Sequence, residues 1–106
     1  MTRERLPERR AALTATVPFG QEKIHVSFGT FFDGRLAELF AAGPKIGSDM
    51  RTSIQEAVTA ASFALQYGAD PEEILRALPR THDDRPEGAL ATILDAWVKL
   101  CQPEAR

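Results

Sequence analysis

The residues with the clearest potential for chemistry lie in the segment GPKIGSDMR, residues 43–51. The segment opens a run of apolar residues with helical spacing, so its backbone N–H groups are expected to be unpaired at a helix start. Together with the helix dipole, such groups form a seat for an anion such as a phosphate. The residues that would build this anion seat are Lys45, Gly47, Ser48 and Arg51.

The same segment also has a purely structural interpretation. Ser48 is a good N-cap, and the carboxylate of Asp49 complements the dipole of the helix that follows. That carboxylate would compete with a bound anion for the same backbone donors. The segment does not match the phosphate-binding pattern GxxxxGK[ST]. A structural cap and an anion site therefore both stay open.

Other kinds of catalytic or metal-binding site are not indicated. His25 and His82 have no partners at ligand spacing, so we expect no metal site and no cofactor. Cys101, the single cysteine, lies on the apolar stripe of the last expected helix, where we expect a buried thiol that acts as a small hydrophobic group. No nucleophile–base pair can be identified, so no catalytic residue is assigned.

Length and charge limit the classes of function. The 106 residues suffice for one domain, which we place at residues 11–102 after a basic arm at residues 1–10. The arm has four arginines against two glutamates, whereas the chain from Ser48 onward has six basic residues against ten acidic ones. Such an acidic half is a poor nucleic-acid surface. We expect the arm to be solvated or to order on a partner, with Arg9 and Arg10 as the contact residues.

The expected location follows from what the sequence lacks. There is no run of 18 apolar residues, and the charged N-terminus has no apolar core of a signal peptide. A single cysteine fits a reducing compartment. We therefore expect a soluble, cytoplasmic protein without a membrane association.

The first half of the chain has the two-residue periodicity of β-strands. Strands are expected over residues 13–17, from residue 24 up to residue 32, and over residues 35–40. Pro18-Phe19-Gly20 predicts the first turn, and Asp33-Gly34 predicts a type I′ hairpin turn. The expected product is a three-stranded antiparallel meander whose open edges would allow pairing with a second copy.

The second half has the 3.6-residue periodicity of helices. The longest helix is expected to begin at Ser48 and to stop at Gly68. Two more are expected, one from Asp70 to Pro79 and one from Pro86 or Glu87 to just before Pro103. The predicted fold class is α+β with the order βββααα and a long central helix packed on the sheet. The outer stripe of that helix is polar but nearly uncharged, so we expect the helix to be covered on more than one side. The members of the stripe are Thr52, Gln55, Thr59, Ser62 and Gln66.

Several stretches of the chain match a known family in their order. They are RERLPERR, EKIHVSFGTFFDGRLAELF with Asp-Gly at the turn, KIGSDMR, ALQYGADPEEIL and ATILDAW. On these motifs the chain resembles the C-terminal region of adenosylcobalamin-dependent (class II) ribonucleotide reductases, which belongs to the TSCPD domain family. The LQYG…PEE stretch and the Asp-Gly hairpin together make the resemblance fairly specific.

The chain also departs from that family. The string Thr-Ser-Cys-Pro-Asp is absent, and the family's TRFEP stretch has become THDDRPEG. The reductase barrel, with its radical and redox cysteines, is not in these residues, so we do not expect them to reduce nucleotides alone. The resemblance implies a stand-alone accessory domain that docks on a partner, such as a reductase subunit, or on a second copy. The alternative is a nucleotide- or nucleic-acid-binding protein that uses the arm and residues 45–51.

Overall fold

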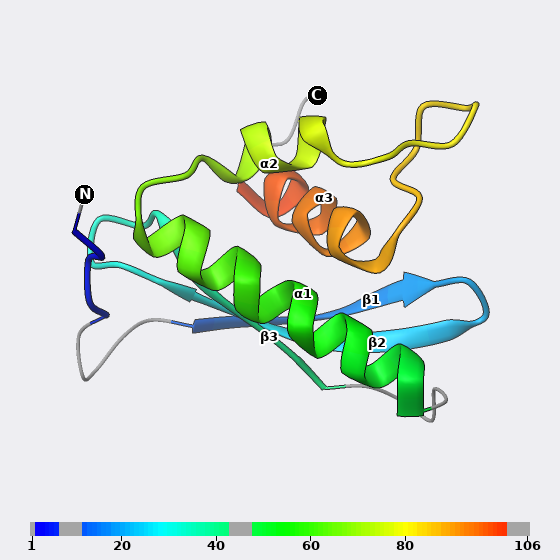
Figure 1. Ribbon diagram of the computed structural model, residues 1–106, viewed down its shortest axis with the longest axis horizontal. Coiled ribbons are helices and arrows are strands. Elements are labelled where there is room, and N and C mark those ends of the chain that lie inside the picture. Colours follow the sequence, from blue (N-terminus) through cyan, green and yellow to red (C-terminus); the bar gives the residue numbers. More distant parts are fainter. Residues whose placement is uncertain (1, 7–11, 43–47, 102–106) are drawn as a thin grey trace.

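The computed structural model describes residues 2–6, 12–42 and 48–101 (Figure 1). Three strands are followed by three helices, which confirms the predicted α+β class and the order βββααα. The strands pair as an antiparallel sheet of order β1-β2-β3. The elements are β1 (Ala12–Phe19), β2 (Glu22–Thr30), β3 (Leu36–Ala42), α1 (Ser48–Gln66), α2 (Pro71–Ala77) and α3 (Ala89–Cys101).

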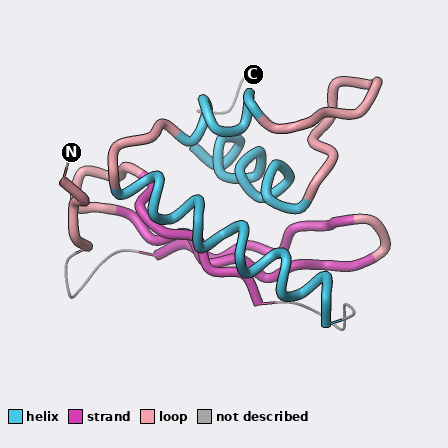
Figure 2. Tube along the Cα trace, viewed as in Figure 1, coloured by secondary structure: helices cyan, strands magenta, loops and turns pink. Residues whose placement is uncertain are grey.

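The sheet and the helices form two layers (Figure 2). Helices α1 and α3 pack on the same face of the sheet, because the apolar residues of each strand fall on every second position and point to that face. The rings of Phe28 on β2 and Trp97 on α3 lie 5.3 Å apart between their centroids. None of the described helices combines the length and the apolar character needed to cross a membrane.

Both hairpin turns differ from the predicted ones. Strand β1 continues through Pro18 and Phe19, and a two-residue connection follows with Gly20 at a φ of 62°. The connection from β2 to β3 spans residues 31–35, and the N–H of Gly34 donates to the carbonyl of Phe31 at 3.0 Å. Only Gly34 of the Asp-Gly pair has a positive φ, so the predicted type I′ turn is wrong.

The helix ends follow their local signals. Gly68 has a φ of 105°, and the N–H groups of Gly68 and Ala69 donate to the carbonyls of Leu65 and Ala64, both at 3.0 Å. This left-handed C-terminal cap confirms Gly68 as the stop of α1. At α2, the carboxylate of Asp70 accepts a hydrogen bond from the N–H of Glu72 at 3.0 Å, which confirms Asp70 as the N-cap.

The polar stripe of α1 is covered only in part. Ser62 and Gln66 are buried, whereas Thr52, Gln55 and Thr59 are exposed. Helix α1 is covered by β3 and, on its apolar side, by the core that it shares with α3, as expected for a helix covered on more than one side. The side that carries Thr52, Gln55 and Thr59 stays exposed, because α1 lies along β3 at one border of the sheet.

Candidate functional site

The predicted site residues are only partly within the described chain. Lys45, Gly47, Arg9 and Arg10 lie outside the described residues. Ser48 is the first residue of α1, and Arg51 is exposed in its first turn. The anion seat and the partner contact therefore stay predictions. The seat can be tested by replacing Lys45 and Arg51 together by alanine. If the seat exists, this double variant must lose affinity for phosphate.

The two histidines do not meet. The Thr16 hydroxyl and Nδ1 of His25 lie 3.2 Å apart on the outer face of the sheet. Nε2 of His82 is 2.8 Å from the carboxylate of Asp83 in the loop before α3. Among the residues that the structure describes, no group of three or more histidine, cysteine, aspartate or glutamate side chains is arranged to hold a metal ion.

Cys101 is not the core residue that its place on the apolar stripe predicts. It is the last residue of α3 and is exposed, because the last turn of α3 extends past the apolar contacts that end at Trp97. Partial burial, with a smaller contribution from the negative charge of Glu72, raises the pKa of its thiol above the ordinary value of 9.0. A raised pKa is the opposite of what a catalytic thiolate needs.

The best-organised polar cluster joins residues 2–6 to the C-terminal end of α1. Nε of Arg3 donates to the side-chain oxygen of Gln66 at 2.5 Å, and the backbone N–H of Glu4 donates to the backbone carbonyl of Gln66 at 2.8 Å. The expectation of a solvated arm is therefore wrong for Arg3 and Glu4. In the sequence, only the stretches LQYG and RERLPERR pointed to these residues, and neither stretch showed that Arg3 and Glu4 contact Gln66.

Gln66 links three parts of the chain. Its side chain is buried, and its amide nitrogen donates to the backbone carbonyl of Ala37 in β3 at 2.9 Å while its amide oxygen accepts from Arg3. A buried amide is costly unless both of its ends are paired, and here both are. In the stretch LQYG, Leu65 fills the core, Gln66 makes this link and Gly68 ends the helix.

Ser62 makes a second link between α1 and β3. Its hydroxyl oxygen accepts the N–H of Leu39 and donates to the carbonyl of Val58, both at 2.8 Å. β3 has only β2 as a neighbouring strand, so the groups of Ala37 and Leu39 that bind α1 are ones that a further strand would otherwise pair. The predicted pairing of sheet edges between copies is thus blocked along this part of β3.

One ion pair joins residues 2–6 to the turn between β2 and β3, and a second lies within that turn. Arg35 contacts Glu4 at 3.0 Å and Asp33 at 2.7 Å, and its guanidinium lies 4.6 Å from the ring centroid of Phe31. The side-chain hydrogen bond from Arg35, followed by the one from its backbone N–H, lowers the pKa of Asp33 below the ordinary 3.8. All three charged side chains are about half exposed, so each pair stabilises the fold only slightly.

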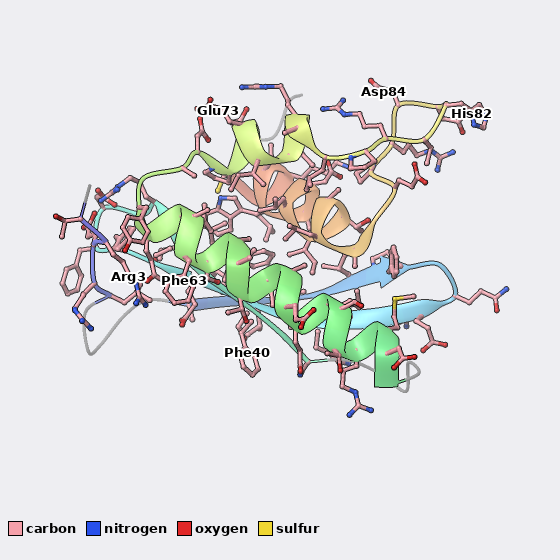
Figure 3. All side chains as sticks on the ribbon, viewed as in Figure 1. Arg3, Phe40, Phe63, Glu73, His82 and Asp84 are labelled. Atoms are coloured by element: carbon pink, nitrogen blue, oxygen red, sulfur yellow. The ribbon has the colours of Figure 1, made fainter. Side chains whose placement is uncertain are left out.

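Phe63 lies beside Arg3 of this cluster, whereas the ring of Phe40 points away from α1 on the other face of the sheet (Figure 3). Phe63 and Tyr67 on α1 are 46% and 42% exposed, and Phe40 on β3 is 64% exposed. The guanidinium of Arg3 lies 4.4 Å from the ring centroid of Phe63. Aromatic residues and arginine are enriched in protein–protein interfaces, so this composition favours a contact surface.

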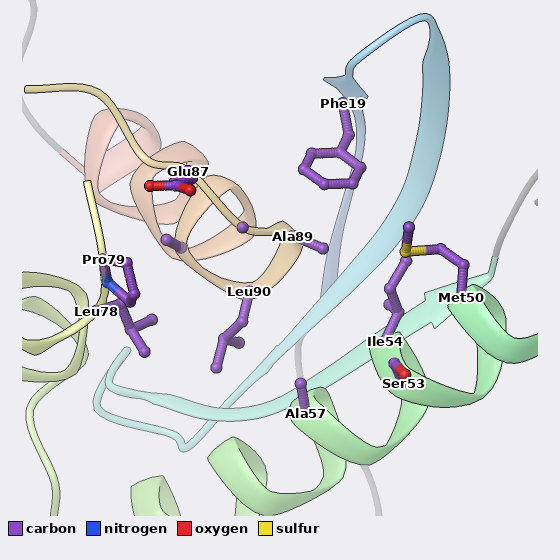
Figure 4. Close-up of a pocket in the computed structure, with 12 residues that line it drawn as sticks. Phe19, Met50, Ser53, Ile54, Ala57, Leu78, Pro79, Glu87, Ala89 and Leu90 are labelled. Atoms are coloured by element: carbon purple, nitrogen blue, oxygen red, sulfur yellow. The ribbon is translucent and has the colours of Figure 1, made fainter. Parts of the chain in front are cut away.

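A separate apolar groove of about 470 Å³ lies between α1, the end of β1 and the start of α3 (Figure 4). Glu87 is the one charged residue among its described lining residues. The groove therefore suits an apolar group and contains no arrangement for acid–base chemistry. Its larger side chains include Phe19, Met50, Ile54, Leu78 and Leu90.

The fold and the site define a small α+β domain whose long helix is fastened to an edge strand and to residues 2–6 by buried polar links. Within the described residues, no set of catalytic side chains is assembled. The model of the TSCPD domain family matches residues 1–100, and the chain belongs to this family.

Curated relatives agree with this assignment. The chain is 37% identical over 79 residues to the vitamin B12-dependent ribonucleotide reductase of Agrobacterium fabrum and 35% identical to that of Bradyrhizobium diazoefficiens; each match covers 74% of this chain and 6% of the relative. The corresponding protein of Rhodopirellula baltica is 34% identical, with 74% of this chain and 8% of the relative covered. The chain thus spans less than a tenth of the length of these relatives, and no solved structure matches it significantly.

Proposed function

We propose that this chain is a non-catalytic accessory domain of the ribonucleotide-reductase type, which acts by docking on a protein partner. One observation carries the proposal: 74% of the chain matches vitamin B12-dependent ribonucleotide reductases, yet the match covers only 6–8% of their length. A stretch of that size is too short to contain the catalytic body of such an enzyme, so its role beside that body is contact rather than chemistry.

The described structure supports contact over chemistry. The polar residues of the buried cluster, Arg3, Ser62 and Gln66, are engaged with one another or with backbone groups, so they hold the fold together. Burial and the charge of Glu72 raise the pKa of the Cys101 thiol, the opposite of what a nucleophilic thiolate needs. The exposed aromatic side chains, in contrast, offer a surface on which a partner can be bound.

The test uses the reductase of Agrobacterium fabrum from which the matched stretch has been removed. This chain is expected to bind that truncated reductase and to show no ribonucleotide reduction alone. The matched control is the excised stretch of the reductase itself, supplied as a separate polypeptide in the same assay. Ribonucleotide reduction by this chain alone would overturn the proposal, and so would binding of the control stretch without binding of this chain.

A further inference from the structure

The outward side of α1 carries almost no charge although it is exposed. From Thr52 to Tyr67 the one charged residue is Glu56. A helix that faces water normally presents several charges on that side, so an uncharged exposed face indicates that something covers it. We define the α1 outer face by six of the exposed residues of α1 and its C-terminal end, Thr52, Glu56, Thr59, Ala60, Phe63 and Tyr67, with exposed Gln55 at its border.

The positions of these residues have an internal symmetry. They are arranged in pairs at equal distances from the midpoint between Thr59 and Ala60: 59 with 60, 56 with 63, and 52 with 67. A helix with such spacing presents matching positions to a second copy that runs antiparallel across a two-fold axis at that midpoint. In that arrangement Glu56 of one copy lies opposite Phe63 of the other.

We propose that the α1 outer face binds a second copy of this chain, with the two α1 helices antiparallel across a two-fold axis. A two-fold axis repeats every contact, so one complementary pair of features supplies two contacts. A second copy can therefore bind only if the two halves of the outer face complement each other in shape and in charge.

The shape is complementary. Around Glu56 the outer face has a shallow hollow of about 350 Å³, lined by Thr52, Gln55, Glu56, Thr59 and Ala60. The phenyl ring of Phe63 projects at the other end of the face and is 46% exposed. The antiparallel arrangement places Phe63 of each copy over the hollow of the other, where the short side chains of Thr59 and Ala60 leave room for the ring. Buried aromatic anchors of this kind contribute most of the binding energy of an interface.

The charges are complementary as well. Glu56 is at the hollow, and the guanidinium of Arg3 lies 4.4 Å from the ring of Phe63 at the opposite end. When Phe63 fills the hollow of the partner copy, Arg3 is carried next to Glu56 of that copy. Each dimer thus gains two ion pairs between unlike charges, which fix the antiparallel register more than they raise the affinity.

The interface needs more than α1 alone. Helix α1 has 19 residues, and at 1.5 Å per residue it is about 28 Å long and about 10 Å wide with its side chains. Its outer face therefore supplies about a third of the roughly 800 Å² per partner that a stable interface buries. Residues 2–6, which are hydrogen-bonded to the end of α1 through Arg3 and Glu4, widen the face beyond α1 alone. Ser62 and Gln66 occupy the β3 edge beside α1, so on this side of the molecule the helix rather than the sheet edge is the surface for a second copy.

Sedimentation equilibrium of the full chain tests this inference. The mass is expected to rise with concentration from that of the 11.7 kDa monomer to that of a dimer. Phe63→Ala removes one anchor from each copy and is expected to weaken dimerisation about a hundredfold, since each lost anchor costs about tenfold or more. Ala60→Arg fills the hollow and is expected to give a monomer. The matched control is Glu73→Arg, an exposed change on α2 on the far side of the molecule (Figure 3), which leaves the dimer intact.

A charge exchange tests the register. Glu56→Arg alone weakens the dimer by repulsion from Arg3 of the partner copy, and the double variant Arg3→Glu with Glu56→Arg restores it. Arg3 also binds Gln66, so a change at Arg3 could affect folding, and far-ultraviolet circular dichroism is used to check that the variants are folded. Cross-linking is a second, independent measurement. In a Cys101→Ser background, Thr59→Cys lies beside the axis and is expected to form an intermolecular disulfide much faster than Glu73→Cys.

The outcomes decide the inference independently of the proposed function, because self-association is measured on this chain alone. A chain that stays monomeric at every concentration overturns it. So does a dimer that Ala60→Arg leaves unchanged, since that dimer would use another surface. Dimerisation lost in Ala60→Arg and recovered in the charge exchange supports it.

Discussion

Arg3 donates a hydrogen bond of 2.5 Å to the side-chain oxygen of Gln66, although the two residues are 63 positions apart in the sequence. The nitrogen of the same amide donates to the carbonyl of Ala37. One side chain therefore closes the domain, because it ties the segment before the sheet and the edge strand to the end of the long helix.

The first prediction concerns this link. Gln66→Leu keeps the size of the side chain but leaves the carbonyl of Ala37 and the guanidinium of Arg3 without their partner. We expect the free energy of unfolding to fall by about 1–3 kcal/mol, the cost of leaving a buried polar group unpaired. Urea denaturation measures it. Gln55→Leu, an exposed position on the same helix, is the control and is expected to change stability by less than about 0.5 kcal/mol. Equal effects of the two changes would contradict this role of Gln66.

The second prediction concerns Ser62 and the N–H of Leu39. Ser62→Ala removes the acceptor for this N–H, so we expect a loss of about 1–3 kcal/mol and faster hydrogen exchange at the Leu39 amide. Thr59→Ala on the exposed side is the control. It is expected to be neutral or slightly stabilising because alanine has the higher helix propensity. Unchanged exchange at Leu39 in Ser62→Ala would show that another group protects that amide.

Ser62 and Thr59 also show how far the structure can be predicted from the sequence. The strands and helices could be predicted because burial of one face imposes a period of two or of 3.6 residues on the apolar positions. Thr59 and Ser62, however, are equivalent in that pattern, and only the position of β3 beside α1 makes one exposed and the other buried. Periodicity reports which side of a helix is apolar and does not report which polar side chains meet an edge strand.

The same limit applies to the candidate site. The stretches LQYG and RERLPERR could be recognised, but the contact of Arg3 with Gln66 joins residues far apart in the sequence and depends on the tertiary fold. Cys101 shares the period of the α3 core, yet that core ends one turn earlier, at Trp97. A periodic pattern does not show how far along the helix its neighbours extend.

The third prediction concerns the end of α1. Gly68 has a φ of 105°, a conformation that strains any residue with a Cβ atom. We expect Gly68→Ala to lower the free energy of unfolding by about 1–2 kcal/mol. Gly88→Ala is the control, because Gly88 does not have a positive φ and a Cβ atom there would meet no atom within 4 Å. That change is expected to be neutral or stabilising by up to about 1 kcal/mol through the unfolded chain. Thermal unfolding of the two variants compares them, and an equal response would argue against a left-handed cap.

The fourth prediction concerns the pKa of Asp33, which its hydrogen bonds to Arg35 hold below the ordinary 3.8. Since the folded-state pKa is lowered, the stabilising effect of this pair is present above the pKa of the unfolded chain and is lost as the pH falls through the folded-state value. Arg35→Leu is expected to move the pKa of Asp33 back toward 3.8, although the backbone N–H of residue 35 still donates to it. An NMR titration of the carboxyl carbon measures the shift. Arg85→Leu removes a pair with Asp83 elsewhere and is expected to leave Asp33 unchanged.

The fifth prediction concerns the reactivity of Cys101. The thiol is exposed, so a disulfide reagent is expected to modify it in the native protein without unfolding. Partial burial and, to a smaller extent, the charge of Glu72 raise its pKa above 9.0. Less of it is then present as the reactive thiolate at pH 8, and modification is expected to be slower than in the unfolded chain.

Glu72→Gln removes the electrostatic part of this effect and is expected to lower the pKa of the thiol and speed its modification slightly. Glu73→Gln, the neighbouring acidic position on α2, is the control and is expected to have the smaller effect, because Glu73 does not contribute to the raised pKa. The pH dependence of the modification rate gives the pKa in each variant directly. Because burial contributes more than Glu72, the pKa in Glu72→Gln should still lie above 9.0, and a fall below that value would show that the charge, not the burial, controls this thiol.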